Sequence, residues 1–352
     1  MIESLMIGDA MALKHIKNII KQDLAMDLGT ANTLIYVQRE GVVLNEPSVI
    51  AYSANGWVIE VGLAAKKYLG RTPEGITAVR PMKDGIIEDF DAVSQLIKVF
   101  LNRAQERKGI FSPRIVICIP SNITQVEKRA VLEAAQEAGA KKIFLLEETM
   151  AAAIGAGLPV NEEEPQMVLD IGGGTTEAAI IAKRSYLHCE TLRVAGDEFD
   201  DAIVRWLTKE RNLLVGLTTA ETIKWDIGSV WDDEKELDQE YSVGGKHFLR
   251  GVPVTSVITP RELMPALEKP LDAIANMIEG MLGVSSPDIR ASIEANGITL
   301  TGGGALLRGI IQFLSLRTGL TFHLTSDPLT TVVQGAGRTI EAFKDYERVF
   351  IN

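Results

Sequence analysis

Residues 167–180, MVLDIGGGTTEAAI, restrict the possible folds more than any other stretch of the chain. An apolar run ends at Asp170, three glycines follow, and two threonines lead into a second apolar run, which is typical of a strand, a tight turn and a strand. Because Gly172, Gly173 and Gly174 lack side chains, we expect the backbone to take left-handed angles and to point its N–H groups at an anion. The turn suits a phosphate, although many hairpins carry glycines for backbone reasons alone.

A second copy of this pattern lies in the first half of the chain. Residues 24–37, LAMDLGTANTLIYV, run through an apolar strand, Asp27, Gly29, a small polar turn, Thr33 and another apolar strand. The shared pattern D-[LI]-G-x-[AG]-x-T, once in each half, indicates a duplicated domain with two facing turns and one carboxylate on each. This arrangement meets the needs of a magnesium nucleotide, because Mg²⁺ keeps most of its waters and binds few protein oxygens.

Length and composition indicate a folded protein of two domains. The chain of 352 residues is too long for one ordinary core, and 46% apolar with 24% charged residues is a normal balance for a soluble protein. The net charge of −11 argues against nucleic acid as a partner, since that binding needs a basic face. Cys118 and Cys189 predict buried free thiols, and the lack of a signal peptide or membrane span predicts a cytoplasmic protein.

Strands and helices alternate along the rest of the chain, which predicts an α/β fold. In the first half, residues 90–104 have the apolar spacing of an amphipathic helix, and Asp84 with Gly85 predicts a turn. A capping box, TQVE at residues 124–127, predicts a helix that ends at Gly139.

The second half contains further start signals for helices. Capping boxes at residues 218–221 and 259–262 predict two helices, and Ser286 before a proline predicts a third. Between the first two, residues 232–253 predict a strand hairpin that turns at Gly244 and Gly245.

A third glycine turn follows an expected strand at residues 297–301. Gly302, Gly303 and Gly304 precede the stretch ALLRGIIQFLSL, which we expect to be helical. A glycine turn at a helix N-terminus is the other common anion site, because unpaired N–H groups and the helix dipole point at the ligand. The chain therefore has three turns compatible with phosphate.

Three charged side chains fit nucleotide chemistry. Glu148 begins a helix between the two halves and can orient an attacking water, but a carboxylate in a first helical turn is favourable for dipole reasons alone. Glu221 and Lys224 lie one turn apart and can bracket an adenosine ribose. The alternative is that Glu221 only closes its capping box and that Lys224 is solvated.

Other catalytic classes lack their motifs. The four histidines are scattered, and the sequence has no HExxH motif and no cysteine cluster, which argues against a catalytic metal of the zinc type. It also has no GxxxxGK[ST] loop and no strand–GxGxxG–helix unit, so neither a P-loop enzyme nor a dinucleotide-binding domain is expected.

Two segments have the character of membrane contacts. Residues 11–21 place Leu13, Ile16 and Ile20 at helical spacing between lysines, so this stretch either lies on an anionic membrane or packs on its own domain. In the loop ERKGIFSPR, Ile110 and Phe111 either insert into lipid or a partner or fold back onto the domain.

At this point the chain resembles a known family, the MreB-type bacterial actins. The resemblance extends from residue 24 to about residue 340, and the two longer strings, EETMAAAIGAGLPV and TGGGALLRG, are more specific than the hairpins, which alone indicate the wider superfamily of actin, heat-shock chaperones and sugar kinases. The motifs that carry the resemblance are DLGTANTLIYV, PMKDGIIEDF, EETMAAAIGAGLPV, DIGGGTTEAAI, ETIKWDIGS and TGGGALLRG.

The resemblance implies an actin-like fold, two related α/β domains of four subdomains around a nucleotide cleft. Residues 1–23 would form an amphipathic extension, and residues 24–160 would form domain I, with subdomain IB inserted at about 51–83 and the C-terminal helix at about 333–352 completing it. Residues 161–332 would form domain II, with subdomain IIB inserted at about 199–262. The implied function is an ATP-dependent cytoskeletal filament on the inner membrane surface that organises cell shape and wall elongation.

The resemblance also implies roles for individual residues. The water for hydrolysis would be positioned by Glu148 and Thr175, and Asp27 and Asp170 would serve Mg²⁺ through water. The phosphates of ATP or ADP would be held by Gly29, Thr30, Ala31, Asn32, Gly172, Gly173, Gly174 and Thr175. The adenosine would be contacted by Glu221, Thr222, Ile223 and Lys224. The nucleotide would be covered by Gly302, Gly303, Gly304, Ala305 and Leu306.

The implied partners are further copies of the chain in paired protofilaments, the membrane, and shape or wall-elongation proteins. Residues 124–139 match the surface that pairs protofilaments, and the apolar residues of the two membrane segments match the anchors of the family. The sequence departs from the family at Thr149, where proline is usual, at Ala195, where glycine is expected, and in its longer N-terminus.

Two other members of the superfamily remain as alternatives. A metabolic kinase would share the nucleotide site and add a substrate pocket with a general base. A chaperone ATPase would need a peptide-binding domain, for which we expect no room before Asn352.

Overall fold

The computed structural model describes residues 22–70, 73–105, 114–232 and 237–351. The expected N-terminal helix with Leu13, Ile16 and Ile20, and the loop with Ile110 and Phe111, lie outside the described residues.

Two five-stranded sheets with the same topology form the centre of the molecule. The first sheet has the order β10-β9-β1-β2-β3 and the second the order β13-β12-β11-β17-β18. In each, a central strand pairs antiparallel with the next strand of its hairpin and parallel with a later strand. The first sheet contains β1 (Leu24–Leu28), β2 (Asn32–Val37), β3 (Gly41–Pro47), β9 (Arg114–Ile119) and β10 (Lys142–Glu147). The second contains β11 (Gln166–Ile171), β12 (Thr176–Ala182), β13 (Ser185–Leu192), β17 (Ile298–Thr301) and β18 (Phe322–Leu324).

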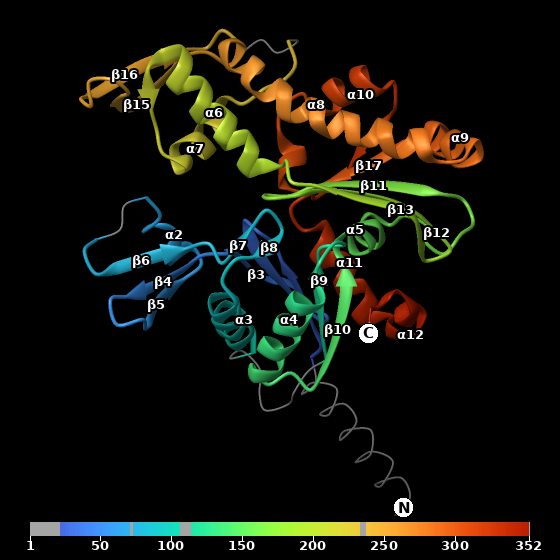
Figure 1. The fold of residues 1–352 in the computed structure, drawn as a ribbon. Helices are drawn as coiled ribbons and strands as arrows, with labels where there is room; N and C mark the ends of the chain where they lie inside the picture. The colour runs from blue at the N-terminus through green and yellow to red at the C-terminus, as the bar shows by residue number, and fades with distance from the viewer. Residues whose placement is uncertain (1–21, 71–72, 106–113, 233–236, 352) are drawn as a thin grey trace, which may run out of the picture.

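We call the part built on the first sheet domain I and the part built on the second sheet domain II; Figure 1 shows domain II above domain I. Both hairpins have the expected strand–turn–strand form, since the turns fall between β1 and β2 and between β11 and β12. Domain I carries α3 (Phe90–Gln105) and α4 (Gln125–Glu137). Domain II carries α6 (Gly196–Arg211), α8 (Pro260–Val284), α9 (Pro287–Asn296) and α10 (Ile310–Thr318).

A pair of small-residue helices lies between the sheets. Helix α5 (Glu148–Ala156) packs against α11 (Thr331–Glu341), which also contacts strands of the first sheet (Figure 1). A side chain at Gly155 or Gly335 would collide with the backbone of the facing helix. The C-terminal α11 is followed by α12 (Phe343–Tyr346) and η2 (Glu347–Val349).

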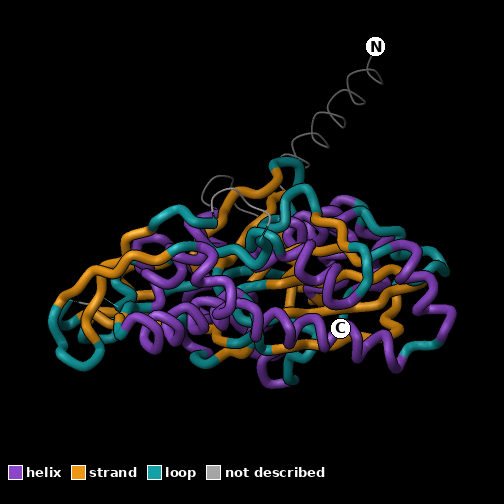
Figure 2. The backbone as a smooth tube through the Cα atoms, turned by 90° about the horizontal axis from the view of Figure 1, so that it is seen from above, coloured by secondary structure: helices purple, strands orange, loops and turns teal. Residues whose placement is uncertain are grey.

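Each domain also carries a small lobe, and both lobes lie on the left in Figure 1. The lobe of domain I consists of β4 (Ile50–Ser53), β5 (Val58–Val61), α2 (Leu63–Lys66) and β6 (Ile76–Val79). The lobe of domain II consists of β14 (Leu213–Leu214), α7 (Leu217–Ile227), β15 (Tyr241–His247) and β16 (Pro253–Ile258). Seen from above in Figure 2, the molecule is elongated, and the lobes form one of its ends.

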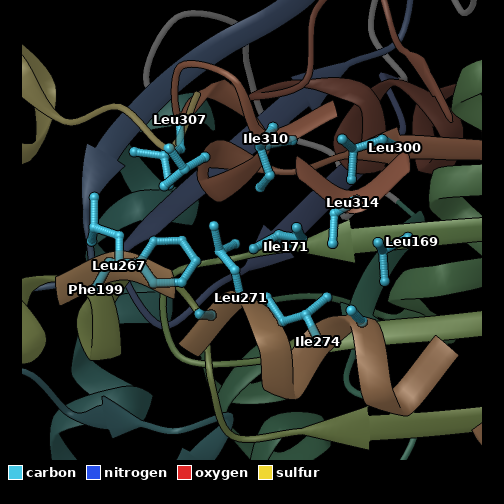
Figure 3. Packing of buried hydrophobic residues seen from close by; sticks show 14 of the residues in the cluster. Leu169, Ile171, Phe199, Leu267, Leu271, Ile274, Leu300, Leu307, Ile310 and Leu314 are labelled. Atoms are coloured by element: carbon cyan, nitrogen blue, oxygen red, sulfur yellow. The ribbon is translucent and has the colours of Figure 1, made fainter. Parts of the chain in front are cut away.

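The core of domain II explains why its long helices pack on the second sheet. Leu169 and Ile171 on β11 meet Leu271 on α8 and Phe199 on α6, and all four side chains are fully buried (Figure 3). The apolar stripe of α8 thus covers the alternate residues of the central strand, as the helical and strand periods require.

Three details differ from the expectations from sequence. Helix α7 begins after Gly216, and no side chain caps it, so the expected capping box at Thr218 is absent. Gly244 and Gly245 lie inside β15, and the hairpin turns between β15 and β16 instead. The segment after Gly304 opens with a short 3₁₀ turn, η1 (Gly303–Leu306), before α10.

The remaining start signals are confirmed. The capping boxes at Thr124 and Thr259 are both formed, Ser286 caps α9, and Asp84 with Gly85 turns between β7 (Met82–Lys83) and β8 (Ile86–Ile87). Among the helices in the described ranges, none has both the length and the apolar character needed to cross a membrane.

Candidate nucleotide site

The two hairpin turns lie against each other and line one cavity of about 440 Å³, a size common for small-molecule sites. Asp27 lies near the end of β1 and Asp170 near the end of β11, and both line this cavity. They come to the same place because the two sheets, which share one topology, present the same end of their central strands to each other.

The glycines of the second turn allow close approach to the first turn. None of Gly172, Gly173 and Gly174 has a left-handed φ, so the expectation of left-handed angles is wrong for them. A Cβ on Gly173 would lie 2.6 Å from Cβ of Ala31, and one on Gly174 would lie 2.9 Å from the side chain of Thr30. These glycines are therefore needed because the two turns interlock.

The third turn approaches the second turn from β17. Gly302 has a φ of 86°, and a side chain there would collide with the carboxylate of Asp170. Gly303, Gly304 and Leu306 line the cavity, whereas Ala305 is buried in the core of domain II. Because η1 is a single short turn, close backbone approach, rather than the dipole of a long helix, brings this segment to the site.

Most of the residues predicted for the site share this cavity. The structure places on its lining Asp27, Gly29, Thr30, Ala31, Asn32, Glu148, Asp170, Gly172, Gly173, Gly174, Thr175, Glu221, Lys224, Gly302, Gly303, Gly304 and Leu306. Three predicted contacts lie away from it. Ile223 and Ala305 are core residues, and the Thr222 hydroxyl donates to the Thr218 carbonyl on the exposed side of α7.

Buried carboxyl groups gather in this cavity. Burial raises the pKa of Asp27 to about 7, and burial together with the charges of Asp27 and Glu177 raises that of Asp170 to about 8. Burial, followed by the charges of Glu177, Asp27 and Asp170, also raises the pKa of Glu148 well above its ordinary value.

Buried carboxylates that repel one another suit a bound cation, because a cation restores their ionised form. In the described residues, no cluster of three or more His, Cys, Asp or Glu side chains is placed to hold a metal. Two carboxylates without a full protein cage fit Mg²⁺, which keeps several waters and takes phosphate oxygens as further ligands. Asp27 and Asp170 are therefore the residues that would hold it.

The predicted adenosine residues are held by other side chains. Lys224 Nζ forms an ion pair with Asp200 Oδ1 at 2.8 Å and donates to the Gly196 carbonyl at 2.8 Å, so it is neither solvated nor free. These bonds attach α7 to the start of α6.

Ala195, where the family resemblance predicts glycine, lies just before α6. It has an extended φ of −157°, which any residue adopts, so glycine is not required there.

Glu221 forms an ion pair across the cavity mouth. Its Oε2 lies 2.7 Å from Nζ of Lys66 on α2, which belongs to the lobe of domain I, and this ammonium also lies 5.3 Å from the ring centre of Trp225. A second ion pair, Arg80 with Asp197 at 3.0 Å, joins the domains nearby. Lys66, Arg80 and Trp225 line the cavity, and sequence reasoning missed them because isolated basic or aromatic residues carry no motif.

The chain has clear relatives among known proteins. It matches the family described as MreB/Mbl protein over residues 21–348. It is 43% identical over 335 residues to the cell shape-determining protein MreB of Escherichia coli (strain K12), covering 94% of this chain and 96% of that protein. It is 40% identical over 318 residues to the cell shape-determining protein Mbl of Bacillus subtilis (strain 168), covering 90% and 95% of the two chains.

Solved structures agree with this similarity. MreB5 of Spiroplasma citri bound to ADP superposes with a TM-score of 0.87 at 33% identity, over 93% of this chain and 98% of that one. The same protein bound to AMPPNP superposes equally well. A MamK double helical filament shares the fold at a TM-score of 0.73 and 20% identity, over 91% and 99% of the two chains.

The paired sheets and the cavity between them therefore define an actin-like protein, as the fold prediction stated. Within that class, the chain belongs to the MreB/Mbl family. This assignment gives no support to the alternative of a metabolic kinase.

Proposed function

We propose that this protein binds ATP and Mg²⁺ in the cavity between its domains, hydrolyses ATP slowly, and assembles into membrane-associated filaments that organise cell shape. The main observation behind this proposal is that the two glycine-rich turns interlock and that Asp27 and Asp170 line the same cavity. Relatives named as cell shape-determining proteins, and an ADP-bound and an AMPPNP-bound structure of similar fold, support the proposal.

Different residues of the cavity have different proposed roles. The backbone of the turns at residues 29–32 and 172–175 holds the phosphates, and Asp27 with Asp170 holds Mg²⁺ through its waters. When bound, the ion neutralises charge on the phosphates. Glu148 and Thr175 orient the attacking water, and the raised pKa of Glu148 suits a carboxyl group that exchanges a proton with it.

The nucleotide part of the proposal can be tested directly by binding. A fluorescent ATP analogue with Mg²⁺ should bind the wild-type protein, and Asp170→Asn should weaken binding by at least about tenfold, because a carboxylate that accepts from the waters of the ion is lost. Equal affinity of the two proteins, with or without Mg²⁺, would contradict the assignment of Asp27 and Asp170.

Filament assembly is the second part of the proposal. The assembly of MamK in a double helical filament supports it at the level of the fold, and residues 124–139 are proposed to pair protofilaments. On α4, Val126 is 68% exposed, so an apolar side chain is available on this surface. Sedimentation with ATP and Mg²⁺ tests assembly, and a protein that stays monomeric at micromolar concentration with every nucleotide would contradict it.

Membrane attachment is the third part. The proposed contacts are Leu13, Ile16, Ile20, Ile110 and Phe111, argued from the sequence alone. Removing residues 1–21 and changing Ile110 and Phe111 to serine should abolish binding to anionic liposomes. Leu316→Ser, at an apolar residue that is 72% exposed elsewhere, is the matched control and should bind as wild type does. Unchanged binding of the first variant would place the surface elsewhere. On the membrane, shape or wall-elongation proteins are the proposed partners.

A further inference from the structure

A chain of hydrogen bonds crosses the domain boundary beside Glu148. Glu147, Glu148 and Thr149 form the start of α5, and Tyr186 stands on β13 in domain II. The Thr149 hydroxyl donates to Tyr186 Oη at 3.1 Å. The residue that follows Glu148 is thus joined to a hydroxyl group of the other domain.

A second link runs parallel to the first. Ser121, which follows β9 in domain I, donates its backbone N–H to Glu177 Oε1 at 3.1 Å and its hydroxyl to Oε2 at 3.3 Å. Glu177 lies on β12 in domain II and also accepts from Thr191 at 3.0 Å. The hydroxyl oxygens of Ser121 and Thr149 lie 3.4 Å apart, so the two links meet.

The residues of these two links are largely buried. Thr149 is fully buried, Glu177 is only 1% exposed, and Tyr186 is partly buried. In such an environment water does not replace a lost partner, so a hydroxyl that loses its bond leaves its partner unpaired. The first turn of α5 and the sheet of domain II therefore keep one relative position while the bonds last.

We propose that Thr149 is a positioning residue for Glu148, acting through its hydrogen bond to Tyr186 across the domain boundary. The bond fixes the first turn of α5 against β13, so that Glu148 reaches the attacking water only in the arrangement of domains seen here. This inference rests on the proposed function, in which Glu148 orients the water.

The test compares ATP hydrolysis in four variants with equal amounts of assembled protein. Thr149→Val keeps the shape of the side chain and removes the hydroxyl, and Tyr186→Phe removes the other end of the bond. We expect each to lower kcat about tenfold with KM within about twofold, since misplacing a reacting group lowers rate rather than binding. Thr149→Ser keeps the hydroxyl and should hydrolyse ATP at nearly the wild-type rate.

The double variant Thr149→Val with Tyr186→Phe separates positioning from general damage. Because both changes break the same bond between Thr149 and Tyr186, we expect the double variant to be no slower than the slower of the two single variants. Losses that multiply in the double variant would overturn the inference, as would an unchanged kcat in both single variants. If Thr149→Val does not fold, Tyr186→Phe alone carries the test, since it removes one oxygen from a partly buried ring.

A fifth variant separates this inference from the proposed function. If Glu148→Gln abolishes hydrolysis while Thr149→Val and Tyr186→Phe do not slow it, the positioning role is wrong and the proposed function stands. If Glu148→Gln leaves hydrolysis unchanged, both are wrong, because there is then no water-orienting carboxylate at this position to place.

Discussion

Domain I and domain II share the order and direction of their five strands, yet they contribute differently to the cavity between them. The turn of domain I carries the side chains of Thr30 and Ala31, whereas the turn of domain II is made of glycines into which those side chains fit. A duplicated hairpin has thus become two complementary surfaces. The difference shows that glycine is required in the turn of domain II because side chains from the turn of domain I occupy the adjacent space.

The same asymmetry appears at the mouth of the cavity. Domain I contributes the cations Lys66 and Arg80, and domain II contributes the anions Glu221 and Asp197. Since each pair joins the two domains, separation of the domains at this end breaks both. Four predictions test these differences between the halves.

The largest effect is expected from Gly173→Ala, which places a Cβ 2.6 Å from that of Ala31. Overpacking of this kind costs about 1–3 kcal/mol, so we expect a lower melting temperature and ATP affinity reduced by at least about tenfold. Adding Ala31→Gly should restore part of the lost melting temperature and part of the lost ATP affinity. Thermal melts measure the first and fluorescence titration the second.

The matched control for this change is Gly280→Ala on α8, where a new Cβ meets nothing within 4 Å. It should raise stability by about 0.5–1 kcal/mol, because alanine is the better helix former. If Gly173→Ala were equally harmless, the interlocking of the turns would be disproved.

The second prediction concerns the two aspartates and pH. In the folded protein the pKa is about 7 for Asp27 and about 8 for Asp170, against 3.8 ordinarily, so the folded state binds more protons between these values. Stability without nucleotide should therefore fall as pH rises from about 4 to about 8. Asp170→Asn should flatten this slope and raise the melting temperature at pH 8 by about 2–4 °C.

The exposed Asp345 provides a control for the loss of one carboxylate, since Asp345→Asn should leave the melting temperature at pH 8 near that of wild type. Thermal melts from pH 5 to 8 in the absence of nucleotide and Mg²⁺ make the measurement. A slope in Asp170→Asn as steep as in wild type would show that the two carboxylates do not share one buried site.

The third prediction concerns the ion pair between the lobes. Lys66→Met or Glu221→Gln should speed nucleotide release by about three- to tenfold, equivalent to about 1 kcal/mol for a largely buried pair at 2.7 Å. Exchanging the charges, Lys66→Glu with Glu221→Lys, should restore slow release. Arg129→Ala removes an exposed pair with Glu133 and should have no effect. If the charge-exchanged protein released nucleotide as fast as the single variants, the ion pair would not be what slows release.

The smallest effect compares two sequence motifs that look alike. Thr124 caps α4 in domain I, whereas Thr218 lies inside α7 and caps nothing. Thr124→Ala should cost about 1 kcal/mol, and Thr218→Ala should stay within about 0.5 kcal/mol of wild type. Urea unfolding measures both, and equal losses would mean that the boundaries of α7 are wrong.

Local patterns predicted the elements of this protein well. The hairpins, the helix over residues 90–104 and the capped helices follow from apolar period and cap chemistry, which act over a few residues. The predictions were wrong where contacts with distant parts of the chain decide the local conformation. Gly244 and Gly245 resemble a turn, yet they lie within β15 because they pair with Thr255 and Val254 of β16.

The candidate site was predicted from motifs and from the family resemblance as far as backbone turns and acids are concerned. Lys66 and Arg80 were missed because a basic residue acquires a role only when the other lobe brings an anion to it. Ile223 and Ala305 were included because they lie between site residues in the sequence, although a helix or tight turn points successive side chains in different directions.

The sequence alone therefore determined the strands, the turns, the two carboxylates and the family resemblance, since each depends on residues that are close together in the chain. Only the tertiary structure decided which glycine faces which side chain, that Lys66 reaches Glu221, and that Tyr186 bonds Thr149 beside Glu148. These contacts join the two domains, and their formation depends on how the two sheets are placed relative to each other, which no local pattern specifies.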